Sequence, residues 1–423
     1  MGNIINDRLK IESEIPSFKV VNFEFEWEPN CHGILQINGY IDYNDECEIE
    51  TLYGSKVKII QLMRSEWRPI FYGYIISVTL KKVGNVMTIF LMAWSTTCML
   101  DIIFEDKSFQ KVEKTYAEVI REVVKNSGGQ VICTEGESEK IGTPLIQYHE
   151  TVWDFSKRLG SYIENCIVAD ITSEQPALWF GMRRGEYIQR IEETECNINM
   201  KCLLKEEGEM IYEIESRNFY RVGDKIVFCG NDLTVSSVKA TFKQGELIYR
   251  YVLRNVLKYK QILFNKLYAG IGFKGTITDV KGEKVKIALD IDKDVVEGEY
   301  LFEWNPETGN GLYAMPEIGV KAILFIPSRD ERQGFVVHCL PNEIGPVAEY
   351  CNKYFINVRG QSFHVFMESA SLHRGIRHGV SIEDQYISVD CMQNISIIAN
   401  DQIRITASKI FINSLDNLDI CQG

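Results

Sequence analysis

The C-terminal part of the chain repeats a three-residue motif in which one variable residue stands between two apolar residues. Of all the features of the sequence, this repeat limits the possible folds most. Successive motifs begin seven or eight residues apart, with mostly polar residues between them. Because residues i and i+2 of a β-strand lie on the same face, each motif predicts a very short strand with one apolar face. The six motifs are Val380–Ile382, Ile387–Val389, Ile395–Ile397, Ile403–Ile405, Ile410–Ile412 and Leu418–Ile420.

A strand of this length cannot bury its own apolar face, so neighbouring units must cover it. A meander formed by one chain leaves much of that face exposed and leaves edge N–H and C=O groups without partners. Three chains wound about one axis cover each other's apolar faces and pair their edges. We therefore expect a trimeric β-helix or β-prism stalk, with a monomeric sandwich or a single-chain β-solenoid as the alternative. The residues expected to pack inward are Ile387, Val389, Ile395, Ile397, Ile403, Ile405, Ile410 and Ile412.

Upstream of the repeat, strand-like segments alternate with helical ones. Residues 15–100 are rich in aromatic and β-branched residues punctuated by Gly and Asn, which predicts a closed or nearly closed β-structure. Residues 115–129 show helical spacing of apolar residues, with Thr115 and Glu118 placed as a capping box. A second helix is predicted within residues 150–166, with one apolar face formed by Val152, Phe155, Leu159 and Ile163.

Strands are predicted again from residue 165 onward. Residues 266–280 contain a G-x-G-x-x-G pattern at Gly270, Gly272 and Gly275, but the sequence continues as two strands. A dinucleotide fingerprint needs a helix there, so nucleotide binding is not expected. Residues 273–340 combine short strands with a Gly-rich loop and predict a small Greek-key barrel.

Charge, cysteine placement and the N-terminus exclude several classes of protein. The 423-residue chain has a net charge of −13 and no basic stripe, which argues against nucleic-acid binding. Its twelve cysteines form no C-x-x-C pair, which favours reduced thiols over disulfides or a structural zinc site. The N-terminus lacks the apolar core of a signal peptide, and no apolar run reaches the length of a membrane span. We therefore expect cytoplasmic synthesis and assembly.

The sequence shows no pattern typical of a catalytic site or a cofactor site. It contains no G-x-S-x-G or H-E-x-x-H pattern, and no additional domain in which two carboxylates would flank a cleft. We therefore predict no enzyme, no cofactor and no metal. His373 and His378 would meet their copies near a three-fold axis and offer metal ligands there, but a solvated loop is the simpler interpretation. Cys421 is likewise interpreted as a small apolar residue near the end.

A helix within residues 147–170, a strand pair at 70–101 and a barrel segment at 302–337 together resemble parts of one known family. This family is the hub and spike proteins of contractile injection machines, which include the VgrG proteins of type VI secretion and the hub components of contractile phage tails. Residues 147–170 resemble that family's E-S-x-W-x-F-x-x-R-L helix, with Thr151 in place of Ser and Asn165 where Gly is common. Residues 70–101 resemble a strand pair of the first hub barrel. Residues 302–337 resemble the barrel of oligosaccharide/oligonucleotide-binding (OB) type between hub and stalk, with Val320 in place of Asp.

The resemblance assigns structural roles to particular residues. In the hub helix it points to Glu150, Trp153, Phe155, Arg158 and Leu159, of which Trp153, Phe155 and Leu159 are expected to anchor the helix to its barrel. In the OB-type barrel it points to Trp304, Gly309, Met315, Pro316 and Gly319.

The predicted fold class is mainly β: tandem hub β-barrels with two inserted or appended helices, a small OB-type Greek-key barrel and a C-terminal trimeric stalk. The predicted domains are a first hub barrel at 1–110, a helical insertion at 111–147, the hub helix with a second barrel at 148–265, the OB-type barrel at 266–345 and the stalk at 346–423.

The family implies a homotrimer that forms the central spike of an injection machine. Its implied partners are a hexameric, Hcp-like tube protein, baseplate and sheath proteins, a PAAR-like tip or an effector, and transiently the envelope of a target cell. The particle would carry the spike across that envelope. The alternative is a carbohydrate- or cell-surface-binding β-protein. Such a binder would expose aromatic side chains on the OB-type barrel, whereas a hub would bury Phe302, Trp304 and Tyr313.

Overall fold

The computed structural model shows a mainly β protein in two compact units, Met1–Pro341 and Asn342–Gly423. Gly309, Tyr313, Leu418 and Cys421 lie outside the described residues. The residues that the structure describes are 2–15, 18–41, 52–84, 86–188, 196–197, 203–204, 210–228, 230–255, 259–292, 298–306, 315–340, 354–358, 361–365, 369–375, 378–413 and 419.

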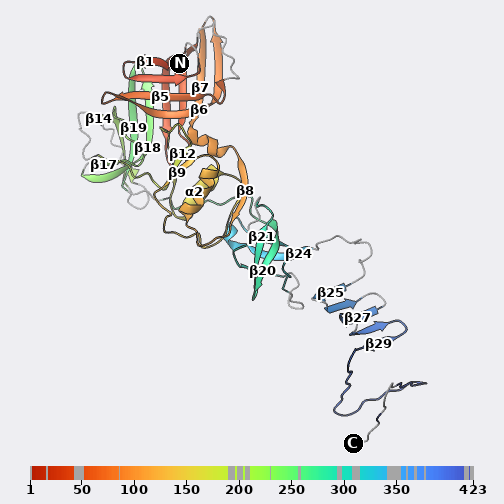
Figure 1. The fold of residues 1–423 in the computed structure, drawn as a ribbon. Helices are drawn as coiled ribbons and strands as arrows, with labels where there is room; N and C mark the ends of the chain where they lie inside the picture. The colour runs from red at the N-terminus through yellow and green to blue at the C-terminus, as the bar shows by residue number, and fades with distance from the viewer. Residues whose placement is uncertain are drawn as a thin grey trace. The chain divides into compact units, whose positions relative to one another are not determined.

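A curled sheet of fourteen strands forms the largest part of the first unit (Figure 1). In spatial order its strands are β1 (Gly2–Asn6), β2 (Leu9–Ser13), β5 (Lys56–Met63), β6 (Glu66–Val83), β7 (Val86–Ser95), β4 (Ile34–Ile41), β3 (Lys19–Trp27), β18 (Asn231–Lys243), β19 (Glu246–Arg254), β16 (Met210–Ser216) and β14 (Cys196–Asn197). Off this path, β17 (Lys225–Phe228) pairs with β18, β13 (Tyr187–Ile188) with β17, and β15 (Leu203–Leu204) with β16.

The sheet continues from the first predicted barrel into the second through the pairing of β3 with β18. Strand β3 shows why the sheet curls around a core. Its Phe23, Phe25 and Trp27 are buried, whereas Glu24 and Glu26 alternate with them on the other face. The domain boundaries proposed within this unit stay predictions.

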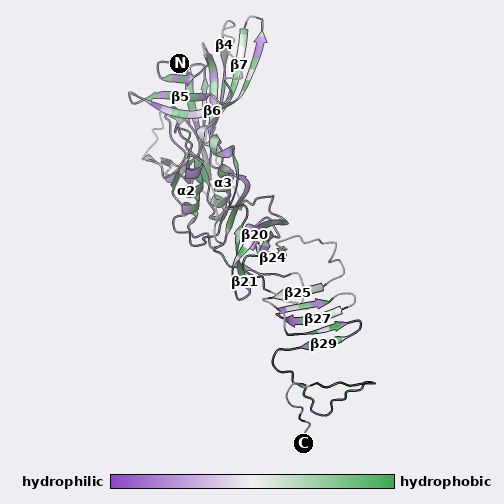
Figure 2. Ribbon diagram, turned by 45° about the vertical axis from the view of Figure 1, so that its right-hand side comes forward, coloured by the Kyte–Doolittle hydropathy of each residue, from purple (hydrophilic) through white to green (hydrophobic). Residues whose placement is uncertain are grey.

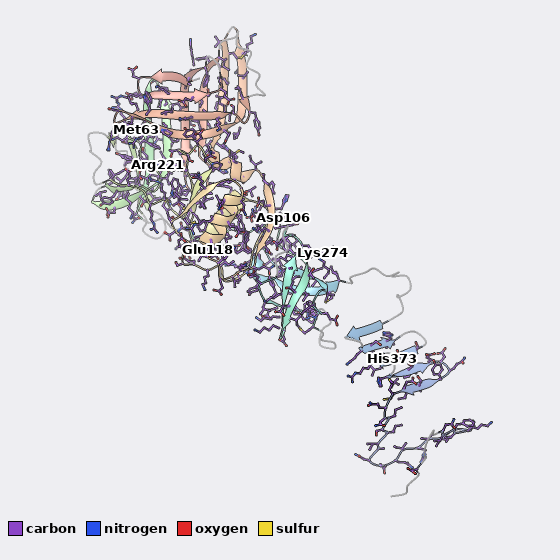
Figure 3. All side chains as sticks on the ribbon, in the orientation of Figure 1. Met63, Asp106, Glu118, Arg221, Lys274 and His373 are labelled. Atoms are coloured by element: carbon purple, nitrogen blue, oxygen red, sulfur yellow. The ribbon has the colours of Figure 1, made fainter. Side chains whose placement is uncertain are left out.

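Two helices and several short strands follow the first part of this sheet. They are the 3₁₀ helix η1 (Thr96–Asp101), β8 (Phe104–Phe109), α2 (Tyr116–Asn126), β9 (Gln130–Cys133), β10 (Leu145–Thr151), α3 (Val152–Tyr162), β11 (Ile167–Ala169) and β12 (Ala177–Phe180). Both predicted helices are confirmed. At the start of α2, the Thr115 hydroxyl accepts from the Glu118 N–H and the Glu118 carboxylate accepts from the Thr115 N–H, so the predicted capping box is confirmed (Figure 3, Glu118).

A separate five-stranded sheet ends the first unit. Its spatial order is β22 (Phe302–Glu303), β21 (Lys284–Leu289), β20 (Ile271–Lys281), β23 (Lys321–Ile326) and β24 (Phe335–Leu340), and a 3₁₀ turn η3 (Glu331–Gln333) precedes β24. Gly272 and Gly275 lie inside β20, and a turn at Gly282 leads directly into β21. The prediction of two strands around the G-x-G-x-x-G pattern is therefore confirmed.

The second unit is a five-stranded antiparallel meander followed by extended chain. Its strands, in order, are β25 (Tyr354–Val358), β26 (Gln361–Val365), β27 (Ser369–Arg374), β28 (Gly379–Glu383) and β29 (Ile387–Asp390). The first two apolar motifs are strands, as predicted. Within the described stretch 391–413, the next three motifs form no strand in the single chain.

The prediction of a mainly β fold with hub-type curled sheets is confirmed, whereas the trimeric stalk stays a prediction. In the part of the chain that the structure describes, no helix combines the length and apolar character needed to cross a membrane.

Candidate functional site

The most distinctive site lies where α3 meets the five-stranded sheet of β20 to β24. We call this sheet the OB-type barrel after its predicted fold, which stays a prediction. Strand β10 leads directly into α3 at Thr151, whose hydroxyl accepts a hydrogen bond from the Asp154 N–H at 3.1 Å. Thr151 therefore caps the helix. The same hydroxyl donates to Asp101 Oδ1 at 2.5 Å, which ties the start of α3 to η1.

Arg158, on the buried face of α3, binds Glu150 at the end of β10. Its Nε donates to Glu150 Oε1 at 2.9 Å and its Nη2 donates to Glu150 Oε2 at 2.9 Å, which is the paired geometry of a strong guanidinium–carboxylate contact. The Arg158 side chain is only 2% exposed. The structure thus brings together two residues that the sequence resemblance singled out.

The guanidinium also reaches the OB-type barrel. Arg158 Nη1 donates to Glu331 Oε1 at 2.5 Å, and the Tyr162 hydroxyl donates to Glu331 Oε2 at 3.0 Å. Arg158 Nη2 also donates to the Tyr268 hydroxyl at 3.1 Å, and this hydroxyl donates to the Ile146 carbonyl. We call Glu150, Arg158, Tyr162, Tyr268 and Glu331 the junction cluster, because it joins the helix to the barrel.

The junction cluster buries one cation between two carboxylates. Burial raises the pKa of Glu150, and although Arg158 acts to lower it, the charge of Glu331 adds to the rise. Burial acts to lower the pKa of Arg158, but Glu331, Tyr268 and Glu150 together hold it well above its ordinary value. Burial also raises the pKa of both tyrosines. A guanidinium that stays charged is therefore the fixed centre of the cluster.

The apolar side of α3 packs into the hub. The Trp153 ring stacks on His32 with centroids 4.0 Å apart, and the Phe155 ring stacks on Phe109 at 5.6 Å. Leu159 is completely buried in the hub core. All three residues predicted to anchor the helix thus lie in the interior, although their contribution to function stays a prediction.

A second polar contact joins the same two parts of the first unit. Asp292, which follows β21, accepts from the N–H and the hydroxyl of Ser108 on β8, both at 2.6 Å. Gln110 Nε2 donates to the Ile287 carbonyl at 3.0 Å. Burial raises the pKa of Asp292 even though the Ser108 hydrogen bonds act to lower it. The junction is therefore held by two sets of polar contacts.

Four of the five residues predicted for the OB-type barrel lie in its core or in one turn, and Gly309 lies outside the described residues. Trp304 and Pro316 are buried, and Met315 is half-buried against the barrel core. Gly319 has a φ of +92°, and the Val320 N–H donates to the Glu317 carbonyl at 3.3 Å. This is a turn that requires glycine at its third position, and Val320, at its fourth position, leaves the turn intact.

The predicted stalk residues are exposed in the single chain. The eight residues from Ile387 to Ile412 that were expected to pack inward are between 50% and 73% exposed. Within the described residues of one chain this stripe is therefore left uncovered, and its packing in an assembly stays a prediction.

Sequence reasoning missed several members of the junction. Glu331 lies 173 residues from Arg158 in the chain and was not singled out, and the same holds for Tyr162 and Tyr268. Their only local signal is a charged or hydroxyl-bearing residue in a loop or at a helix end, and this does not separate them from solvated residues. The stacking of His32 on Trp153 was also missed, because no local pattern in the sequence links the two residues.

The junction offers structural rather than catalytic chemistry. Its carboxylates and hydroxyls are engaged with Arg158 or with each other. Among the residues that the structure describes, no group of three or more His, Cys, Asp or Glu side chains is arranged to hold a metal ion.

Comparison with known proteins gives matches to solved structures only. No family model matches the chain, and no curated protein matches it. The c3393 protein of E. coli is described as a type VI secretion component similar to the T4 bacteriophage tail proteins gp27 and gp5. It aligns at a TM-score of 0.58 and 11% identity, over 78% of this chain and 99% of that protein.

Two further solved structures also match the chain. A chain of the Francisella PdpA–VgrG complex aligns at a TM-score of 0.55 and 10% identity, over 91% of this chain and 88% of that one. A 43 kDa tail protein of prophage MuSo2 from Shewanella oneidensis aligns at a TM-score of 0.44 and 9% identity, over 58% of this chain and 98% of that protein.

The alignments with the E. coli protein and with the Francisella chain, both at TM-scores above 0.5, define the fold of the chain. It is the fold of the spike and hub proteins found in phage tails and related injection machines. More particularly, the chain folds like the VgrG-type spike of type VI secretion, so the family resemblance of the sequence motifs is confirmed at the level of the fold.

Proposed function

We propose that this chain is the homotrimeric central spike and hub of a contractile injection machine. The hub would dock on a hexameric tube, and the stalk would carry a membrane-puncturing tip. The shared fold with a type VI secretion component supports this role. The observation that carries it in this chain is the uncovered apolar face of the second unit.

That face is built by strand register. Phe363, Leu372, Val380 and Val389 are paired in sequence across β26, β27, β28 and β29, and all four are exposed. Ile382 and Ile387 lie two positions from Val380 and Val389, so they share the same face, where they pair with each other and are also exposed. Figure 2 shows hydrophobic and hydrophilic residues alternating along these strands.

The opposite face of the same meander is polar. His364 pairs with Ser371, Ser371 with Ser381, and Ser381 with Ser388. A sheet with one apolar face needs a second layer, because exposed apolar area costs about 25 cal/mol for each Å² left in water. The same apolar spacing continues beyond β29, so the cover must extend along the tail. Two further copies of the chain supply it along the whole length.

The proposed mechanism is mechanical. When the sheath contracts, the tube and spike move forward, and the load passes from hub to stalk through the OB-type barrel. The junction cluster and the Ser108–Asp292 contact join the hub to that barrel. Interlocked chains in the stalk would resist unfolding, because no chain leaves without breaking contacts to the others. Partners proposed on this basis are an Hcp-like tube, baseplate and sheath proteins, and a PAAR-like tip or an effector.

The test of the trimer uses the mass of the full-length chain in solution, measured by light scattering. We expect three chain masses for the wild type. The double variant I395D/I397D places two charges in the apolar stripe and should dissociate to single chains. The matched variant S396D places one charge at the outward position of the same motif and should remain trimeric. A wild-type monomer that stays folded on dilution would refute the proposal.

The alternative function, a carbohydrate- or surface-binding protein, is not favoured by the OB-type barrel. Such a binder needs exposed aromatic platforms. Phe302 and Trp304 are instead buried in the barrel core, and Tyr313 lies outside the described residues.

A further inference from the structure

The junction cluster buries more negative than positive charge. Its carboxylates are Glu150 and Glu331 and its cation is Arg158, and their side chains are 9%, 0% and 2% exposed. The neighbouring pair of Arg332 and Asp330 adds no net charge, because its two members bind each other through two hydrogen bonds of 2.7 Å. With both carboxylates of the cluster ionised, two negative charges therefore face one positive charge in the interior.

A buried charge without a partner is costly, and a carboxyl group avoids this cost by taking up a proton. The other ionisable members of the cluster do not restore the balance. Burial raises the pKa of Tyr162 and of Tyr268, so both hydroxyls stay neutral. The pKa of Arg158 is held well above its ordinary value, so the guanidinium stays charged. A proton on one of the two carboxyl groups is therefore what makes the cluster neutral.

The contacts of the two carboxyl groups favour Glu150 as the one that takes the proton. The two oxygens of Glu331 accept hydrogen bonds from two different donors, Arg158 Nη1 and the Tyr162 hydroxyl, and this arrangement suits an ionised carboxylate. Burial raises the pKa of Glu150, and although Arg158 acts to lower it, the charges of Glu331 and Asp154 add to the rise.

The bulge of β10 also holds an acceptor that lacks a donor. Gln147 is completely buried, and its Nε2 donates to the Glu150 carbonyl at 2.9 Å across the register shift. The Gln147 Oε1 atom is buried as well and accepts no hydrogen bond from the described residues. An ionised carboxylate only accepts hydrogen bonds, whereas a protonated one also donates. A proton on Glu150 therefore adds a donor to a segment in which an acceptor has none.

We propose that the junction cluster is a pH-dependent contact between the hub and the OB-type barrel: Glu150 takes up one proton as the pH falls, and the two parts are then held more tightly. The cluster is placed for this role, because Glu150 and Arg158 come from the hub side and Tyr268 and Glu331 from the barrel side. Since the closed cluster binds the proton more tightly than an opened one, the contact is strongest below the ordinary carboxyl pKa. It weakens as the pH rises through the raised pKa of Glu150. This inference does not depend on the proposed trimer.

The test is amide hydrogen exchange of the full-length protein, followed by mass spectrometry from about pH 4 to about pH 8. The quantity measured is the protection factor, which compares the observed exchange rate with that of an unfolded peptide at the same pH. For β23 and β24, the protection factor of the wild type should fall as the pH rises. The fall should be about tenfold for each pH unit between the ordinary carboxyl pKa and the raised pKa of Glu150, and it should stop above the raised pKa.

Two variants identify the group that binds the proton. Glu150→Gln keeps the shape of the protonated side chain but has no proton to lose, so its protection factor should not change with pH. Glu246→Gln is the matched control, because Glu246 is an exposed carboxylate paired with the exposed Arg217. This control should keep the pH dependence of the wild type. Infrared difference spectra of the wild type and Glu150→Gln at the acid end should show a protonated-carboxyl band in the wild type alone.

Each outcome decides for or against the inference. A falling protection factor in the wild type and in Glu246→Gln, with a flat profile in Glu150→Gln, supports it. A flat or rising profile in the wild type overturns it, and that measurement needs no variant to fold. An equal fall in the wild type and in Glu150→Gln also overturns it, because the proton then binds another group.

Discussion

Replacing Arg158 with Met tests whether the junction cluster holds the hub to the OB-type barrel. Methionine fills much of the same volume but carries no charge and donates no hydrogen bond. The change leaves Glu150 and Glu331 buried without their cation. Their side chains are 9% and 0% exposed, so water cannot replace the lost partner.

The expected loss of stability is large. Removing one member of a buried ion pair costs about 3–5 kcal/mol, because an uncompensated charge remains inside the protein. Here two carboxylates lose the same guanidinium, so we expect the upper part of that range. A domain has only about 5–15 kcal/mol of net stability. Arg158→Met should therefore separate the unfolding of the OB-type barrel from that of the hub.

The assay is urea unfolding of the full-length protein, followed by circular dichroism and by tryptophan fluorescence. The wild type should show coincident transitions for the two parts of the first unit, and the variant should show an earlier one. Arg217→Met is the matched control, since Arg217 forms an ion pair with Glu246 in which both side chains are well exposed. That control should change the free energy of unfolding by no more than about 0.5 kcal/mol.

A compensated variant separates the charge effect from lost packing. Arg158→Met combined with Glu150→Gln and Glu331→Gln removes the cation and both buried charges together. It should recover most of the stability lost in the single variant, because buried ion pairs often contribute little compared with neutral replacements. If Arg158→Met costs less than about 1 kcal/mol, or if the triple variant is less stable than the single one, the reasoning is wrong.

Three further predictions concern the same unit. Because the pKa of Glu150 is raised in the folded state, folding is favoured when this carboxyl group is protonated. The free energy of unfolding of the wild type, relative to that of Glu150→Gln, should therefore fall as the pH rises. The fall should begin near the ordinary carboxyl pKa and continue through the raised pKa of the folded state. Urea midpoints of both proteins from about pH 4 to about pH 8 measure this, and parallel curves would contradict it. Thr151→Ala removes a helix cap and the hydrogen bond to Asp101, and should cost about 1–2 kcal/mol in urea unfolding. Gly319→Ala forces a Cβ into a turn with a φ of +92° and should lower the free energy of unfolding in urea by about 1 kcal/mol or more. The variant Gly270→Ala, at an exposed glycine that also has a positive φ, tests whether this cost is general.

Local patterns were enough to predict the elements of the fold. The helical spacing of Val119, Ile120 and Val123 predicts α2, and all three residues are buried in it. The aromatic and β-branched residues of 15–100 predict strands, and β3 is one of them, with one face buried. These predictions succeed because helix and strand periods depend on residues a few positions apart. The continuity of the sheet through β3 and β18 depends on segments about two hundred positions apart and was not predicted.

The candidate site shows the same division. Family resemblance pointed to Glu150 and Arg158, which lie eight positions apart and do bind each other. It gave no sign of Glu331, whose carboxylate completes the cluster from the OB-type barrel. A carboxylate in a loop is most often solvated, so only the packing of the barrel against α3 shows that this one is buried.

The tail shows what one chain is able to do by itself. Val380 pairs with Val389 and Ile382 pairs with Ile387, so β28 and β29 form an ordinary hairpin within the chain. The motifs at Ile395, Ile403 and Ile410 have the same apolar spacing, yet the described residues around them form no strand. The apolar pattern alone therefore does not form a strand, since a strand also needs a neighbour for its N–H and C=O groups. If other copies supply that neighbour, the tail gains order only on assembly, and its stability then depends on protein concentration as well as sequence.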